Sequence, residues 1–168
     1  MQPILGSAIE EFIEISEDAD IKLTSRKATK EELKMLESEL PVKLPQWYRD
    51  LIGDYPIINL EVKWNVETTN PSYSGETAIE FFEPQYIIEE TMEEFPGIDL
   101  VHLNYICIGS EPAGTGDNYY IRLDDEDPTL YQFPIPIGSD ETEPLLERRI
   151  QIAEHISDVF REAIKTIQ

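Results

Sequence analysis

The amino-acid sequence predicts an α+β fold: N-terminal helices, a central, mostly antiparallel sheet and a C-terminal helix. Strand-like segments cluster in the middle of the chain instead of alternating with helices, which is typical of α+β proteins. Apolar residues recur at helical spacing near both ends. The length of 168 residues favours one domain, which we expect to span residues 1–168.

Two helices are expected before residue 41. The first covers about residues 7–16, where isoleucine and phenylalanine side chains fall on one stripe and glutamates lie outside it. The second begins after Thr29, because a threonine followed three positions later by Glu32 forms a capping box. Pro41 ends this helix, since proline cannot continue it.

A short third helix is expected over residues 44–53. Pro45 suits the first turn of a helix, and Gly53 suits the position just beyond its end. Its candidates for burial are Trp47, Tyr48, Leu51 and Ile52.

Two later segments also have helical spacing. Residues 84–95 place the glutamates largely outside, and residues 144–167 carry a long apolar stripe. The expected buried residues of the first segment are Tyr86, Ile87, Ile88, Met92 and Phe95. The stripe of the second consists of Leu146, Ile150, Ala153, Ile156 or Ser157, Phe160 and Ile164.

Residues 58–66 alternate between apolar and polar side chains, which predicts a strand with one buried and one solvated face. The apolar set is Ile58, Leu60, Val62, Trp64 and Val66. A solvated face favours an antiparallel sheet. Further strands are expected over residues 77–82, 103–108, 119–123 and 130–133.

Negative charge is the outlying feature of the composition. The chain has 35 acidic and 13 basic residues, and its net charge is −22. No lysine or arginine occurs from Trp64 to Ile121, a stretch that holds eleven acids. Such a field repels nucleic acid and anionic lipid and attracts cationic partners. The alternative explanation is that the acids only keep the protein soluble.

Several classes of protein are excluded by composition. The single cysteine, Cys107, leaves no internal disulfide, cysteine-rich zinc site or CxxC redox motif. The first residues lack the basic and apolar regions of a signal peptide, and no run of 18 apolar residues occurs. We therefore expect a cytoplasmic protein that does not bind membranes.

A glycine-rich loop separates two strand-like segments and contains Gly109, Gly114 and Gly116. A phosphate-binding loop needs a lysine after its second glycine and a helix behind it, but Thr115 and a strand-like segment follow here. Calcium is a second possibility, since Asp117 and residues 124–127 supply oxygen ligands, although EF-hand spacing is absent. The simplest interpretation is a connection between antiparallel strands whose glycines adopt positive φ values.

No arrangement of residues indicates nucleophilic catalysis. Cys107 lies between two isoleucines in a predicted strand, as a small buried side chain would. His102 lies five residues away, so strand alternation would place it on the opposite face, and His155 belongs to the last predicted helix. We expect no catalytic residues, no cofactor and no metal ligands.

Three segments together resemble the SUKH superfamily, the Smi/Knr-like proteins. Residues 40–59 resemble its helix with a leucine–proline start, where Pro45 and Tyr48 match the proline and the aromatic residue. Residues 78–90 resemble its strand followed by an acidic helix start. Residues 106–121 resemble its glycine-containing hairpin. Order and spacing agree over roughly residues 29–165.

The resemblance implies an α+β fold without enzymatic activity. Many bacterial members look like immunity proteins, which bind and neutralise a toxin domain, often a nuclease; other members are scaffolds or regulators in signalling. Two departures stand out: residues 53–55 replace the family's usual turn, and residues 111–113 lengthen the glycine loop.

Charge and resemblance together predict a partner-binding surface. A nuclease must hold a polyanion, so its cleft is basic, and an acidic inhibitor is steered toward it. We therefore expect a basic protein partner, such as a toxin domain, and no direct contact with nucleic acid. The candidate partner-binding residues are Glu89, Glu90, Glu93, Glu94, Glu111 and Asp117.

Overall fold

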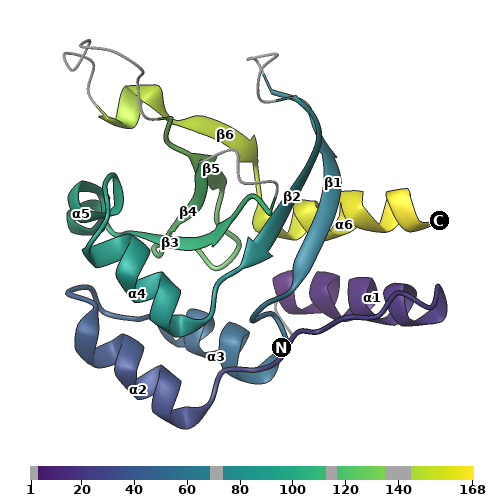
Figure 1. The fold of residues 1–168 in the computed structure, drawn as a ribbon, viewed down its shortest axis with the longest axis horizontal. Coiled ribbons are helices and arrows are strands. Elements are labelled where there is room, and N and C mark those ends of the chain that lie inside the picture. Colours follow the sequence, from purple (N-terminus) through teal and green to yellow (C-terminus); the bar gives the residue numbers. More distant parts are fainter. Residues whose placement is uncertain (1–3, 69–73, 113–116, 135–144) are drawn as a thin grey trace.

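A computed structural model of the chain describes residues 4–68, 74–112, 117–134 and 145–168. Helices pack around a curled sheet of six strands, which confirms the predicted α+β class (Figure 1). The elements are α1 (Ile4–Asp18), α2 (Lys30–Glu39), α3 (Gln46–Asp54), β1 (Glu61–Val66), β2 (Gly75–Phe81), α4 (Pro84–Met92), α5 (Gly97–Leu100), the 3-10 helix η2 (Val101–Leu103), β3 (Tyr105–Ser110), β4 (Asn118–Arg122), β5 (Leu130–Gln132), the 3-10 helix η3 (Leu145–Arg148), β6 (Ile150–Ala153) and α6 (Ile156–Ile167).

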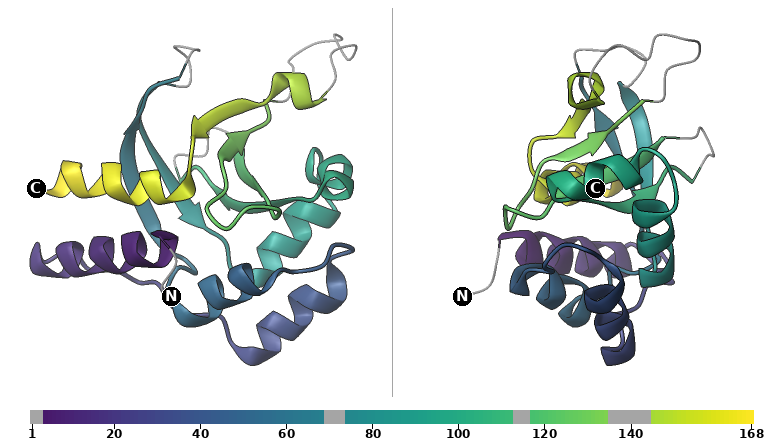
Figure 2. Two further views of the ribbon diagram at one scale, coloured as in Figure 1. Left: turned by 180° about the vertical axis from the view of Figure 1, so that it is seen from behind. Right: turned by 90° about the vertical axis from the view of Figure 1, so that its left-hand side faces the viewer.

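The strands lie in the sheet in the order of the chain, from β1 to β6, and each neighbouring pair is antiparallel. Two views show α2, α3 and α4 gathered below one end of the sheet, while α1 and α6 run beside each other near β1 (Figure 2). None of the helices in these ranges is long and apolar enough to cross a membrane.

The capping box of α2 is present as predicted. The Glu32 amide donates to Thr29 Oγ1 at 3.1 Å, and the Thr29 amide donates to Glu32 Oε1 at 3.0 Å. Arg26 donates to both carboxylate oxygens of Glu32, at 2.6 and 3.0 Å. Local sequence therefore fixes the start of this helix, and the helix ends two residues before Pro41.

Three phenylalanine rings hold α1 and α6 to the sheet. Phe12 on α1 meets Phe160 on α6 edge to face, with 5.7 Å between ring centroids. Phe160 also stacks on Phe81 of β2 at 5.9 Å. All three rings are buried, so this cluster joins the two terminal helices to each other and to the centre of the fold.

The edge strand β1 and the inner strand β3 are buried differently. Exposed and buried residues alternate along β1, as predicted, and Trp64 is only 2% exposed. In β3 five successive residues are buried. Ile106 and Ile108 belong to the main core, whereas Tyr105 and Cys107 pack with Phe133 in a second, smaller core. The main core therefore lies on one face of the sheet, and the second core, to which Leu100 of α5 contributes, lies on the other.

The prediction of one long C-terminal helix was wrong. Residues 150–153 form β6, which pairs with β5, and the helix begins only at Ile156. Ile150 and Ile152 fit a strand of period two as well as a helical stripe, and pairing with β5 decides between them. Asp127 then fixes the start of α6, because it accepts hydrogen bonds from the amide and the hydroxyl of Ser157, at 3.0 and 2.6 Å. Residue 144 lies outside the described ranges.

Two details of α3 also differ from the prediction. Gly53 lies inside the helix, which ends at Asp54. Trp47 is only partly buried, and its indole N–H donates to the carbonyl oxygen of Leu123 at 3.2 Å. A tryptophan with a polar atom to satisfy fits such a half-buried position, whereas Tyr48, Leu51 and Ile52 are buried as expected.

Candidate binding surface on α4 and α5

Helix α4 has one face fixed against the sheet. Ile87 and Thr91 lie one turn apart and are buried, and Thr91 Oγ1 accepts a hydrogen bond from the Cys107 amide of β3 at 3.0 Å. Pro84 occupies the first turn of the helix and is also buried. Because these contacts fix the rotation of α4 about its axis, the opposite face points away from the core.

The expected burial of Tyr86 and Phe95 was wrong, since their side chains are 47% and 48% exposed. Tyr86 precedes the inward-facing Ile87 and is rotated by about 100° from it around the helix. The helix ends at Met92, so helical spacing does not apply to Phe95. Two further apolar side chains nearby, Ile98 and Leu103, are 42% and 45% exposed.

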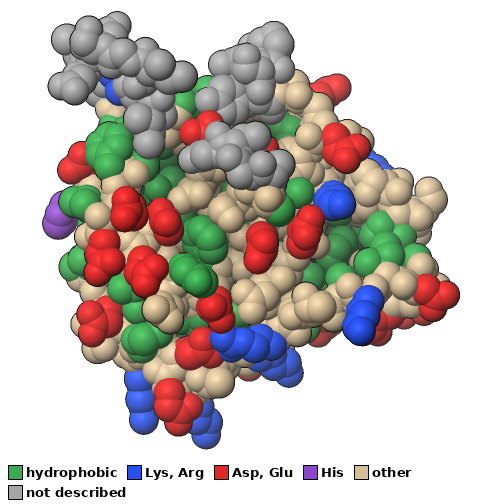
Figure 3. Space-filling model, in the orientation of Figure 1, with side chains coloured by type: hydrophobic (Ala, Val, Ile, Leu, Met, Phe, Trp, Pro, Cys, Tyr) green, Lys and Arg blue, Asp and Glu red, His purple; other side chains and the backbone are tan. Residues whose placement is uncertain are grey.

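Acidic side chains surround these apolar ones. Glu89 lies on α4, Glu93 is its C-terminal capping residue, and Glu94 follows. Asp99 lies on α5. Figure 3 shows red side chains interspersed with green ones over α4 and α5, and no blue side chain among them. Within the described ranges none of these four acids forms an ion pair.

We call this region the α4–α5 surface and define it by its acidic and apolar members. They are Tyr86, Glu89, Glu93, Glu94, Phe95, Ile98, Asp99 and Leu103. The acids were recognisable from the base-free stretch of sequence. Phe95 was missed because helical spacing was continued past Met92, although Pro96 signals a break. Leu103 was instead assigned to the strand predicted over residues 103–108.

Glu90 has a more structural role than its acidic neighbours. Its Oε2 accepts a hydrogen bond from Asn118 Nδ2 at 3.0 Å, which joins α4 to β4. Partial burial raises the pKa of the Glu90 carboxyl above its ordinary value, and the nearby charges of Glu94 and Glu89 raise it further. Glu90 therefore lies at the inner border of the α4–α5 surface.

The last two predicted residues, Glu111 and Asp117, lie in the connection between β3 and β4. Glu111 Oε1 accepts a hydrogen bond from Thr77 Oγ1 of β2 at 3.1 Å. The backbone oxygen of Asp117 accepts one from Gln132 Nε2 at 3.2 Å. The structure thus gathers four of the six candidates at α4 and leaves Glu111 beside β2.

The strand predicted after the glycine loop is β4, so no helix N-terminus follows the loop. Gly109 lies inside β3 without a positive φ. A Cβ atom there would lie 2.7 Å from the Glu80 carbonyl oxygen, so close packing against β2, and not backbone conformation, requires glycine. Gly114 and Gly116 lie outside the described residues.

Among the described residues, no group of three His, Cys, Asp or Glu side chains could hold a metal ion. Asp124 pairs with Arg122, and Asp127 caps α6, so two members of the acidic run have structural partners. Burial raises the pKa of the Cys107 thiol well above its usual range, which keeps the nucleophilic thiolate from forming. His102 lies in η2 and not on a strand, so the expectation from strand alternation was wrong.

Comparison with known proteins identifies the family of this chain. The model of the SMI1/KNR4 family (SUKH-1) matches residues 27–162, which extend from the segment before α2 into α6. Searches of curated proteins and of solved structures returned no match. Since the family model covers most of the chain, this protein belongs to the SMI1/KNR4 family (SUKH-1).

Proposed function

We propose that this protein is a non-enzymatic immunity protein, which neutralises a toxin by binding a cationic domain of it through the α4–α5 surface. The observation that carries the proposal is the combination of four exposed apolar side chains with acids that have no basic neighbour on this surface. Large exposed apolar patches with a polar border are typical of interaction sites.

The charge of this surface favours a basic partner. Glu89 and Glu93 lie four residues apart, a spacing at which like charges destabilise a helix by about 0.2–0.5 kcal/mol. A cationic partner relieves this repulsion on docking and is attracted from a distance. Nucleases provide such a partner, because a cleft that holds a polyanion must be basic.

The apolar side chains of the α4–α5 surface supply binding energy, which charge alone does not provide. Electrostatic complementarity raises association rates more than affinity, whereas buried aromatic anchors dominate binding energy. Tyr86 and Phe95 are exposed aromatic residues of the kind that act as anchors. Membership of the SMI1/KNR4 family also supports the proposal, because the resemblance to SUKH proteins implies an immunity role for many bacterial members.

The test is co-expression of the protein with a panel of toxin domains, followed by co-purification of the rescued pair. We expect rescue from one toxin and not from unrelated ones. The double variant Tyr86→Ala with Phe95→Ala should abolish rescue while the protein stays folded. A control is Ile4→Ala, which removes an exposed apolar side chain elsewhere.

Two results would count against the proposal. If no toxin of the panel is neutralised while a non-toxin protein is captured through the same surface, the protein is a scaffold or regulator, the other role the family implies. If rescue occurs and the Tyr86 and Phe95 variant still rescues, the toxin is bound by another surface.

A further inference from the structure

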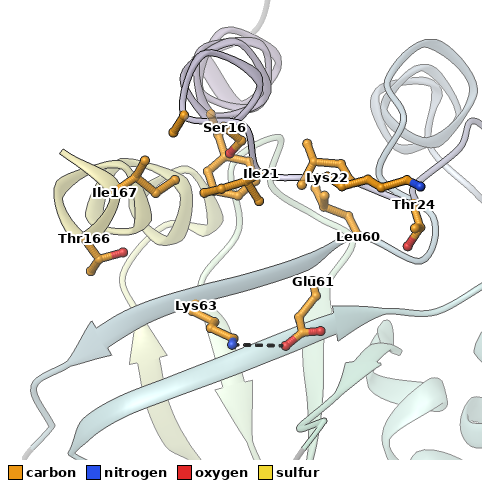
Figure 4. A pocket seen from close by; sticks show the side chains of 12 residues that line it. Ser16, Ile21, Lys22, Thr24, Leu60, Glu61, Lys63, Thr166 and Ile167 are labelled. Atoms are coloured by element: carbon orange, nitrogen blue, oxygen red, sulfur yellow. Dashed lines mark ion pairs between the residues drawn. The ribbon is translucent and has the colours of Figure 1, made fainter.

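A pocket of about 610 Å³ lies at the opposite end of the molecule from α5, between α1, α6 and β1 (Figure 4). Its fourth side is the chain segment 19–24, which follows α1. Phe12, Leu60 and Ile167 are among its apolar lining residues. We call it the α1–β1 pocket. Its volume is within the range of sites that hold small organic molecules, about 300–1,000 Å³.

The charge at this pocket is opposite to that of the α4–α5 surface. Lys22 and Lys63 both line it, against one acid, Glu61. Lys63 Nζ lies 4.0 Å from Glu61 Oε1, at the outer limit of an ion pair, and Lys22 has no ion pair within the described ranges. The pocket lining therefore carries more basic than acidic residues, in contrast to the whole chain with its 35 acids and 13 bases.

A buried hydroxyl group supplies a second, independent observation. Ser16 lines the pocket and is 0% exposed, and its Oγ has no hydrogen-bond partner among the described residues. Figure 4 shows Ser16 above the pocket, with the lysines on the segment 19–24 and on β1. Buried polar groups in proteins are almost always satisfied, so an unpaired hydroxyl in a pocket wall indicates a position for a polar ligand atom.

We propose that the α1–β1 pocket binds a small amphipathic carboxylate, a molecule with an aliphatic chain and one anionic head. The aliphatic part of the ligand lies against Phe12, Leu60 and Ile167, and the anionic head lies at the mouth of the pocket, where the positive charges of Lys22 and Lys63 attract it. An inorganic anion would make no contact with the apolar wall. A neutral apolar molecule would gain no electrostatic attraction from the two lysines. This site shares no residue with the α4–α5 surface, so the inference does not rest on the proposed immunity function.

The probe is octanoate, used below the concentration at which it forms micelles, and binding is measured by titration calorimetry. We expect saturable binding of octanoate and an affinity at least about tenfold weaker for octanol and for acetate. Octanol lacks the charge, and acetate lacks the chain. Bound octanoate should also raise the melting temperature, because a ligand that binds only the folded state stabilises it.

Variants of the charged pocket residues test where the carboxylate head of the ligand binds. Lys22→Gln with Lys63→Gln should weaken octanoate binding about fivefold to twentyfold, in line with two exposed ion pairs. Glu61→Gln should tighten it, because a repelling charge and a competitor for Lys63 are removed. The matched control is Lys30→Gln with Lys34→Gln on α2, which makes the same change in charge at exposed positions and should leave affinity unchanged.

A substitution that fills the pocket tests where the aliphatic chain of the ligand binds. Ala19 is exposed and lines the pocket, so Ala19→Trp should block it without disturbing the core. We expect this variant to keep its melting temperature and lose octanoate binding. Equal affinity for octanoate and octanol, equal effects of the two lysine pairs, or full binding by Ala19→Trp would each overturn the proposal.

Discussion

The α4–α5 surface and the α1–β1 pocket both combine exposed apolar side chains with charge, but they differ in sign and in shape. The surface projects from α4 and α5 and carries only acids, whereas the pocket is concave and has two lysines against one glutamate. A net charge of −22 therefore describes the whole chain but not each of its faces. The two regions select different partners, a cationic protein at one and a small anion at the other.

The two regions also differ in how deeply their apolar side chains are buried. Phe12 and Leu60 line the pocket and are buried in the main core. Tyr86 and Phe95 of the α4–α5 surface are about half exposed. Substitutions of Phe12 or Leu60 should therefore affect folding first, and substitutions of Tyr86 or Phe95 should affect binding first.

The largest expected effect is at Phe160, which packs against the pocket residue Phe12. Phe160→Ala removes the ring that contacts both Phe12 and Phe81, and we expect it to lower the free energy of unfolding by about 3–5 kcal/mol. Phe95→Ala should change it by less than about 0.5 kcal/mol, since its side chain is exposed. Urea denaturation of both variants measures the contrast. A cost at Phe95 similar to that at Phe160 would show that the α4–α5 surface supports the fold.

Charge reversal on the surface should give the next largest effect. Glu89→Lys with Glu93→Lys should slow association with a basic partner at least about tenfold, because steering toward the acids is lost. Folding should be unaffected or slightly improved, since lysine near the C-terminus of α4 interacts favourably with the helix dipole. Association rates are measured by stopped-flow with the identified toxin domain.

The dependence of the association rate on salt concentration is the control for this charge reversal. The screening length falls from about 30 Å at 0.01 M to about 8 Å at 0.15 M ionic strength, so the wild-type rate should fall steeply over this range. Glu11→Lys with Glu14→Lys on α1 makes the same change in charge at exposed positions and should slow association much less. Equal slowing by the two double variants would mean that net charge alone attracts the partner.

A smaller effect comes from an acid that, unlike those of the surface, has a basic partner. Arg26 lowers the pKa of Glu32 to about 2, aided by the Thr29 amide. A lowered pKa stabilises the fold above the ordinary value of 4.5, and this contribution is lost as pH falls toward 2. Glu32→Gln should therefore cost about 1 kcal/mol at pH 7. The difference from wild type should shrink between pH 4.5 and pH 2, as followed by denaturation across that range.

The features that sequence predicted well are those determined by neighbours in the chain. The capping box of Thr29 and Glu32 lies within four residues, and the alternation of β1 is a property of one strand. The start of α6 was missed, although the His155 amide donates locally to Asp158, because the bonds to Asp127 and the pairing of β6 with β5 are not local. Helical spacing described α4 correctly only as far as the helix extends.

The two candidate sites also differ in whether their residues are neighbours in the chain or come from distant segments. The acids of the α4–α5 surface lie within a short stretch, so the absence of bases there was visible in the sequence. The α1–β1 pocket was not visible, because Phe12, Lys22, Lys63 and Ile167 come from four separate parts of the chain. Only the parallel packing of α1 and α6 beside β1, with the C-terminal ends of both helices on the same side, brings them together.

The smallest expected effect concerns Glu90, where the α4–α5 surface meets the core. Burial, together with the charges of Glu94 and Glu89, raises the pKa of the Glu90 carboxyl. A raised pKa in an acid gives stability that is complete below the ordinary value and is lost as pH rises through the raised value. The ionised carboxylate is therefore unfavourable at pH 7. Glu90→Gln should raise the free energy of unfolding there by a few tenths of a kcal/mol, the scale of one like-charge pair on a helix.

At pH 3 the same substitution should change nothing, because a protonated carboxyl and an amide are then both neutral and both accept the hydrogen bond from Asn118 Nδ2. Urea denaturation of wild type and of Glu90→Gln, each at pH 7 and at pH 3, gives the four free energies of unfolding to be compared. Destabilisation at pH 7 would mean that the bond from Asn118 to the charged carboxylate outweighs burial and repulsion. Glu90 would then be an acid held by the fold as Glu32 is, and the α4–α5 surface would end at Glu89.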